Sequence, residues 1–239
     1  VMIKVVEHNF DANRVVISRS AKSNEIPAIT GWFHQGDVHM ARILCDQDGQ
    51  YSFQVEMKDK AGNASAIETV DDFYIDLTAP VIEISEVEDL SANNDVVAPV
   101  IIITDSYFDP DNTMIEIVGA NNGVVKVEGT YDSIQNGQVI RIPDFEREQS
   151  WDDLYTLTVT NTDLAGNTTK ETIQFSVNRF GSVYVFDDGL KSIRGTYKQK
   201  VEDIVFTETN IDVLDEQTIR IVLSHNGIPR TLVKDVDYV

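Results

Sequence analysis

The sequence has few of the residues that carry most protein chemistry. Cys45 is the only cysteine, which excludes an internal disulfide and every thiolate metal cluster. Its expected state is that of a small buried hydrophobe. The histidines number four, and none forms a pair at the spacing of metal ligands. His34 and His39, five residues apart, are expected to face opposite sides of one strand.

Catalytic signatures are also missing. The sequence has no nucleophile-elbow serine motif, no P-loop, no dinucleotide-binding fingerprint and no helical zinc-protease motif. Acidic pairs are frequent, but a chain with 40 acidic residues contains them by composition alone. Because no set of residues with assignable roles emerges, we predict that this chain is not an enzyme.

Positive charge is scarce as well. Lysine and arginine total 19 against 40 acidic residues, and the net charge is −21. A phosphate backbone or an anionic membrane surface would repel such a chain, so we expect no nucleic-acid partner. No run approaches the roughly 18 apolar residues that a membrane-spanning helix needs, so we expect no membrane insertion.

Both ends of the sequence are strand-like. It opens without an initiator methionine or a signal peptide and closes in an alternating apolar run. We therefore expect a piece of a longer, monomeric chain, with any export or anchoring signal outside it.

The sequence contains an internal repeat. Residues 51–63 match residues 155–167 without a gap, and both segments end in Ala-Gly-Asn. A second element, an acidic residue followed by x-Asn/Tyr-apolar-Asp, begins at Glu7, Asp105 and Glu208. Both elements recur at intervals of about one hundred residues, so the chain is predicted to be a tandem array.

The repeat divides the chain into three modules. We predict an N-terminally incomplete module over 1–78, a complete one over 79–178, and the first part of a third over 179–239. The first boundary follows from the linker-like Asp-Leu-Thr-Ala-Pro segment at 76–80, whose proline interrupts strand pairing.

Alternation of apolar and polar residues predicts strands in each module. Tyr51, Phe53, Val55 and Met57 alternate with polar residues, and residues 155–159 repeat this pattern. A period of two indicates half-buried strands of antiparallel sheets. No sustained helical periodicity appears, so the chain is predicted to be all-β.

Each repeated segment ends in a predicted hairpin turn. In the turn an aspartate accepts hydrogen bonds from free backbone amides, and a glycine adopts positive φ. An alternative role for the acidic and amide side chains is calcium ligation. The residues of the two turns are Asp59, Gly62 and Asn63, and Asp163, Gly166 and Asn167.

The tyrosines that open the repeated segments resemble a known structural motif. Tyr51 follows Asp-Gly-Gln and stands two residues before Phe53, which resembles the tyrosine corner of immunoglobulin-type sandwiches with Phe53 in place of a cysteine. Tyr155 and Leu157 repeat the arrangement, and Trp32 is a candidate for the core tryptophan. With the Ala-Gly-Asn turns and the Thr-Ala-Pro linker, the chain resembles the bacterial immunoglobulin-like tandem domains of Gram-positive cell-surface proteins.

This resemblance implies both a fold and a role. The fold is a series of immunoglobulin-like antiparallel β-sandwich modules. The role is a non-catalytic extracellular region, attached to the cell surface or wall, that acts as an adhesin stalk, spacer or cell-adhesion module. The alternative is an accessory or ligand-binding region of an exported carbohydrate-active enzyme, and the partner, a host protein or a glycan, is unknown. Trp151 is either a sugar platform or a lid over the sandwich end.

Calcium is the one cofactor that the sequence suggests. Hard cations take six to eight oxygen ligands, and an acidic joint between modules would supply them and stiffen the array. Turn and capping chemistry is the alternative explanation of the same residues. If calcium binds, it raises the melting temperature relative to EDTA. The candidate ligands are Asp46, Asp48, Asp76, Asp109 and Asp111.

Overall fold

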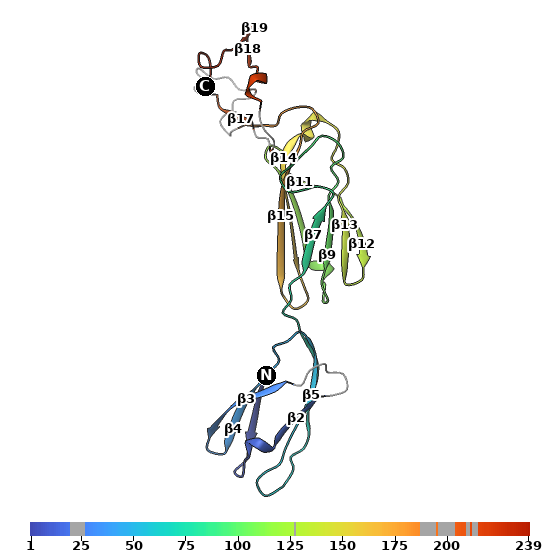
Figure 1. Ribbon diagram of the computed structural model, residues 1–239, viewed down its shortest axis with the longest axis vertical. Coiled ribbons are helices and arrows are strands. Elements are labelled where there is room, and N and C mark those ends of the chain that lie inside the picture. Colours follow the sequence, from blue (N-terminus) through green and yellow to red (C-terminus); the bar gives the residue numbers. More distant parts are fainter. Residues whose placement is uncertain (20–26, 127, 187–194, 196–203, 209–210, 212–214) are drawn as a thin grey trace.

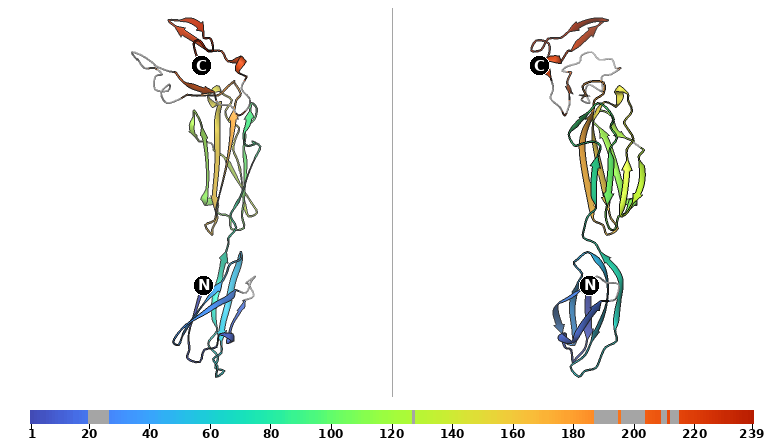
Figure 2. Two further views of the ribbon diagram at one scale, coloured as in Figure 1. Left: turned by 60° about the vertical axis from the view of Figure 1, so that its left-hand side comes forward. Right: turned by 45° about the vertical axis from the view of Figure 1, so that its right-hand side comes forward.

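A computed structural model describes the chain except for residues 20–26, 127, 187–194, 196–203, 209–210 and 212–214. The described residues form β-strands and four short 3-10 helices. This agrees with the predicted all-β class. Two β-sandwiches follow one another along the long axis of the molecule (Figures 1 and 2). No helix among the described residues is long and apolar enough to cross a membrane.

The first sandwich, called the N-terminal sandwich below, has two three-stranded antiparallel sheets with the orders β1-β4-β3 and β2-β5-β6. A 3-10 helix, η1, precedes β2 and is capped by Asp11. Its elements are β1 (Met2–Val6), η1 (Ala12–Arg14), β2 (Val15–Arg19), β3 (Ala28–Gln35), β4 (Val38–Leu44), β5 (Gly49–Met57) and β6 (Glu68–Ile75).

The second, or central, sandwich packs a four-stranded sheet, β12-β13-β9-β7, against a five-stranded sheet, β11-β10-β14-β15-β8. Only β8 runs parallel to its neighbour, β15. The elements are β7 (Val81–Ser85), β8 (Ser91–Asn93), β9 (Val100–Thr104), η2 (Pro110–Asn112), β10 (Thr113–Gly119), β11 (Gly123–Val125), β12 (Thr130–Ile134), β13 (Gly137–Arg141), η3 (Gln149–Trp151), β14 (Asp153–Thr162) and β15 (Thr168–Val177).

Corresponding strands of the two sandwiches follow the sequence repeat. The pairs β1 and β9, β2 and β10, β5 and β14, and β6 and β15 occupy the same places in their sheets. The central sandwich has two further strands, β7 beside β9 and β8 beside β15. The predicted boundary after residue 78 lies between β6 and β7, and the boundary after residue 178 follows β15.

The apolar core of the central sandwich shows why alternation predicted strands. Burial alternates strictly along β14, where every second residue faces the opposite sheet. Leu157 and Phe53, which take the place of cysteines, are both completely buried. Trp151 packs against this core with its ring edge-on to Phe145, so it covers the end of the sandwich. Trp32 is half-buried and contacts Phe10 at a centroid distance of 4.7 Å.

His34 and His39 contradict the sequence prediction. They do not lie on opposite sides of one strand, because a tight turn at Gly36 and Asp37 places them opposite each other on β3 and β4. Their Nδ1 atoms are 2.7 Å apart. The Nε2–H of His39 donates to the Glu7 carbonyl at 2.8 Å, which leaves the His39 Nδ1 to accept from His34.

Both repeated tyrosines close a corner. The Tyr51 hydroxyl donates to the carbonyl of Gln47 at 2.9 Å, and the Tyr155 hydroxyl donates to the carbonyl of Trp151 at 3.0 Å. In each case the acceptor lies four residues upstream, which is the geometry of a tyrosine corner. Burial raises the pKa of Tyr155 to about 12, so its hydroxyl remains a donor at neutral pH.

Removing either corner hydroxyl is expected to destabilise one sandwich. Tyr155→Phe leaves the Trp151 carbonyl and the Asn122 side-chain amide without this partner, at a cost of about 1 kcal/mol. Tyr51→Phe should lower the melting transition of the N-terminal sandwich instead. Differential scanning calorimetry of both variants and their combination checks this. Additive effects are expected because the corners share no partner; unchanged melting in either variant would contradict it.

The C-terminal part contains two short antiparallel strand pairs among its described residues. β16 (Tyr184–Phe186) pairs with β17 (Phe206–Glu208), and β18 (Val222–His225) pairs with β19 (Ile228–Thr231). The 3-10 helix η4 (Glu216–Thr218) is capped by Asp215. The third acidic motif begins at Glu208 and lies partly outside the described residues, so the third module stays a prediction.

Candidate metal centre

Three carboxylates meet where the two sandwiches join. Asp76 lies in the linker after β6, Asp105 follows β9, and Asp163 follows β14. One oxygen of each lies within 4.8 Å of the others. Asp105 is 9% exposed and Asp163 is 3% exposed. We call these three residues the joint carboxylates. Among the described residues, no other three His, Cys, Asp or Glu side chains meet in this way.

Asp163 is positioned by its own turn. Its Oδ1 accepts hydrogen bonds from the backbone N–H groups of Ala165, Gly166 and Asn167 at 2.7–2.9 Å. Its Oδ2 accepts from the Asn167 side chain at 2.8 Å. Gly166 has a φ of 96°, a conformation that a side chain would strain. Burial alone would raise the pKa of Asp163, but these hydrogen bonds hold it below its usual value.

The same turn also binds the linker. The Asn167 amide donates to the carbonyl oxygens of Asp76 at 3.1 Å and of Thr78 at 3.2 Å. The aromatic rings of Tyr74 and Tyr107 pack at a centroid distance of 5.5 Å beside it. Backbone polar groups and aromatic surface from both sandwiches thus meet at the joint.

Asp105 faces the joint from the end of β9. Its Oδ1 accepts from the Tyr107 N–H at 2.6 Å, and its own N–H donates to the Asn136 carbonyl at 2.8 Å. The hydrogen bond to Asn136, in the turn between β12 and β13, therefore holds the backbone of Asp105. The hydrogen bond from the Tyr107 N–H holds its side chain.

Asp76 contributes an oxygen that no protein group satisfies. Its Oδ1 accepts from the Thr78 N–H at 3.2 Å, but its buried Oδ2 has no hydrogen-bond partner. Burial raises the pKa of Asp76, and the charges of Asp105, Asp163 and Asp48 raise it further. A buried carboxylate oxygen without a donor is costly, and either an ordered water or a cation would compensate it.

The donor set fits a hard divalent cation. All three residues offer carboxylate oxygens, which calcium prefers, and neither imidazole nor thiolate takes part. Asp48 adds negative charge nearby, since it accepts from the Leu77 N–H at 2.6 Å and from the Thr78 hydroxyl at 2.5 Å. The arrangement has no nucleophile paired with a base, so its chemistry is binding.

The sequence predicted only some of the residues of this site. Of the five calcium candidates, Asp76 is one of the joint carboxylates and Asp48 holds the adjacent linker. Asp109 caps η2, where it accepts from the N–H of Asp111. Asp46 and Asp111 are exposed and are not among the joint carboxylates.

The other two joint carboxylates both belong to repeated elements; neither is among the five candidates, although calcium ligation was the alternative role given for the turn that contains Asp163. Asp163 was predicted as a turn residue, and Asp105 begins the acidic motif. The signal that would have found them is that both elements end strands at the same pole of the module, next to the linker. The equivalent turn of the N-terminal sandwich holds Asp59 through Asn63 in the same way.

The family model for bacterial Ig-like domains of group 3 matches residues 44–179, more than half of the 239 residues. The chain belongs to this family. The match begins within the N-terminal sandwich and extends through the central one. Bacterial Ig-like domains are generally non-catalytic, and no curated protein matches the chain.

Two solved structures resemble the chain loosely. A protocadherin gammaB7 cis-dimer structure has 19% identity and a TM-score of 0.34 over 73% of this chain. The match spans 43% of the protocadherin chain. A titin structure has 14% identity and a TM-score of 0.31, and the match covers 70% of this chain and 86% of the titin chain.

Proposed function

We propose that this bacterial Ig-like chain is a non-catalytic, extracellular spacer of a Gram-positive surface protein, an adhesin stalk whose joint is fixed by calcium. The observation that carries the proposal is the cluster of three carboxylates between two sandwiches stacked end to end. A stalk must hold its modules at a set angle, and only the joint can determine that angle.

Direct contacts at the joint do not suffice for this purpose. The Asn167 amide and the pair of tyrosine rings connect the sandwiches, but the joint carboxylates repel one another across the same region. Interfaces of this kind allow domains to move unless they are large and apolar. A cation bound by Asp76, Asp105 and Asp163 would turn that repulsion into a cross-link between the linker and two loops of the central sandwich.

The runner-up role, a ligand-binding region of a carbohydrate-active enzyme, has less support. Sugar binding needs exposed aromatic platforms, and Trp151 instead packs against the core of the central sandwich. The surface is also strongly acidic, as suits an extended, solvated spacer.

Small-angle X-ray scattering of the full chain tests the spacer role. In millimolar calcium we expect one extended arrangement, and after chelation a broader distribution of maximum dimensions. Magnesium, which demands a smaller octahedral shell, serves as the matched cation and should be less effective. If the distribution is the same in calcium and in EDTA, the cation does not determine the joint and the proposal fails.

A further inference from the structure

Two histidine rings meet at the end of one sheet of the N-terminal sandwich. His34 and His39 lie directly opposite each other on β3 and β4, beside the tight turn that joins these strands. Residues opposite each other on antiparallel strands have Cβ atoms about 4.5–5.5 Å apart, so their side chains can meet. Here the two Nδ1 atoms are 2.7 Å apart. The hairpin therefore brings two nitrogens that bind metals to one point.

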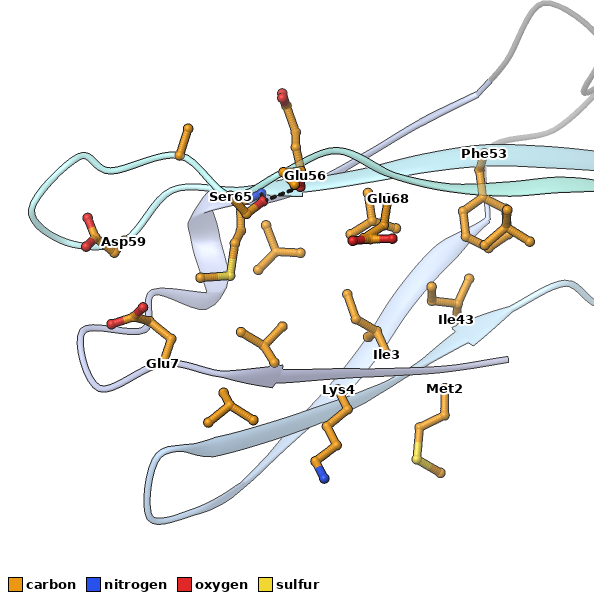
Figure 3. A pocket seen from close by; sticks show the side chains of 18 of the residues that line it. Met2, Ile3, Lys4, Glu7, Ile43, Phe53, Glu56, Asp59, Ser65 and Glu68 are labelled. Atoms are coloured by element: carbon orange, nitrogen blue, oxygen red, sulfur yellow. Dashed lines mark hydrogen bonds between the residues drawn. The ribbon is translucent and has the colours of Figure 1, made fainter.

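Both rings are on the inner side of the sheet. Figure 3 shows Ile3 and Ile43 directed between the two sheets of the sandwich, whereas Lys4 points outward. His39 precedes Ile43 by four residues on β4, and a strand returns to the same face at every second residue. His39 is 8% exposed, and its neighbour His34 remains exposed. The pair is thus anchored in the sandwich on one side and open to solvent on the other.

His39 is held in the state that a metal ligand needs. Its Nε2–H donates to the Glu7 carbonyl at 2.8 Å, so its Nδ1 carries the lone pair. Its ring stacks on Phe10 at a centroid distance of 4.0 Å and an interplanar angle of 10°. A metal-bound histidine in proteins generally donates its second N–H to a carbonyl or carboxylate, which fixes its tautomer and its ring. The Glu7 carbonyl provides this support for His39.

His34 is the adjustable member of the pair. It donates its Nδ1–H to the Nδ1 of His39. A shift of this proton to Nε2, the other tautomer of neutral imidazole, frees Nδ1 as a second ligand without net loss of a proton. Because the His34 side chain is exposed, its ring is free to turn this lone pair toward an ion. Only one of the two ligands has to adjust.

The separation of the two nitrogens favours one kind of ion. With metal–nitrogen bonds of about 2.0 Å, neighbouring ligands of a square-planar ion lie about 2.8 Å apart, and two ligands of a tetrahedral ion lie about 3.3 Å apart. The observed distance of 2.7 Å is close to the square-planar value. Copper(II) and nickel(II) favour tetragonal sites with nitrogen and oxygen ligands, and copper(II) binds most tightly among the first-row divalent ions.

We infer that His34 and His39 form a binding site for a tetragonal transition-metal ion, with copper(II) as the tightest ligand. The two imidazole nitrogens take neighbouring positions around the ion, and water takes the others. The inference depends neither on calcium nor on the spacer role, because the joint carboxylates lie in the linker and the central sandwich. A bound ion would cross-link β3 to β4 and thereby stabilise the N-terminal sandwich.

Copper titration of the full chain tests this site. Millimolar calcium is present throughout to compete for carboxylate oxygens, which hard cations prefer to imidazole. We expect one equivalent of copper(II) to give a tetragonal electron paramagnetic resonance spectrum with coupling to two imidazole nitrogens. The melting transition of the N-terminal sandwich should rise as copper is added. Zinc, which favours tetrahedral sites, should bind less tightly.

Single substitutions separate the pair from other groups that bind copper. His34→Gln keeps a side-chain amide that can donate to His39. It should weaken copper binding by about a hundredfold or more, since loss of even an outer-shell partner costs about 10–100-fold. His39→Gln should have the same effect. The matched control is His8→Gln, because His8 is exposed and contacts Asp37 at 2.9 Å; this variant should bind copper as the parent does.

Three results would overturn the inference. They are no copper binding by the full chain, equal copper affinity in His34→Gln and the parent, and a spectrum with fewer than two imidazole nitrogens. Zinc binding as tight as copper binding would also overturn it, because the tetragonal geometry would then not select the ion. His34→Gln is expected to melt in EDTA at the temperature of the parent, which makes its loss of copper binding attributable to the missing ligand.

Discussion

Replacing Asp76 with asparagine is expected to shift the melting temperature in opposite directions with and without calcium. In EDTA the variant should melt higher, by about 3 °C, because burial and three neighbouring carboxylates make the ionised Asp76 unfavourable. In saturating calcium it should melt lower than the parent. A cation at millimolar affinity stabilises the parent by about 1–2 kcal/mol, and the variant loses most of this gain.

The higher melting temperature expected for Asp76→Asn in EDTA follows from the raised pKa of Asp76. A carboxyl whose pKa is higher in the folded state than in the unfolded state destabilises the protein once it ionises. Mild acidification, which protonates Asp76, should therefore stabilise the metal-free parent. The Asp76→Asn variant should not show this gain in stability. Asp46→Asn, an exposed change outside the joint carboxylates, is the control and should leave the calcium response intact. A shift of Asp76→Asn in the same direction in both buffers would contradict a cation at this joint.

Asp163→Ala is expected to be the most damaging substitution at the joint. It removes a nearly fully buried carboxylate that accepts from three backbone amides and from the Asn167 side chain. Leaving these donors unpaired should cost about 2–4 kcal/mol. The variant should also lose the stabilisation by calcium, because a ligand is gone. Urea denaturation of the central sandwich, monitored at Trp151, measures both effects.

The repeat provides a matched control for this substitution. Asp59→Ala removes the same kind of turn from the N-terminal sandwich, so it should destabilise that sandwich and leave the calcium response unchanged. Hydrogen bonds lower the pKa of both aspartates in the folded state. Their contribution is therefore present above the usual carboxyl pKa of about 4 and lost as the pH falls below it. Equal calcium responses in Asp163→Ala and the parent would exclude Asp163 as a ligand.

Much of the fold followed from local patterns. Alternation over residues 51–57 and 155–159 predicted strands because a strand turns successive side chains to opposite faces. The recurring Asp-x-Ala-Gly-Asn predicted tight turns, since the aspartate and the glycine meet backbone requirements that lie within a few residues. The spacing of Tyr51 and Tyr155 predicted closed corners, and the acceptors are indeed only four residues away.

Relations between distant residues were not predictable in the same way. His34 and His39 were predicted to face opposite sides of one strand, but a hairpin places them opposite each other on β3 and β4. Asp105 and Asp163 were recognised as parts of repeated motifs, but their distance from Asp76 depends on how the linker docks on the central sandwich. Gly137 is another such case, because a Cβ there would collide with the backbone carbonyl of Ile103 on the neighbouring strand.

The sequence by itself determined the all-β class, the repeat, the turns and the acidic character, because each depends on periodicity, composition or contacts within a few residues. Only the tertiary structure decided which acidic side chains meet. The joint carboxylates come from segments far apart in the chain, and the buried, unpartnered oxygen of Asp76 exists only once the linker packs against the central sandwich.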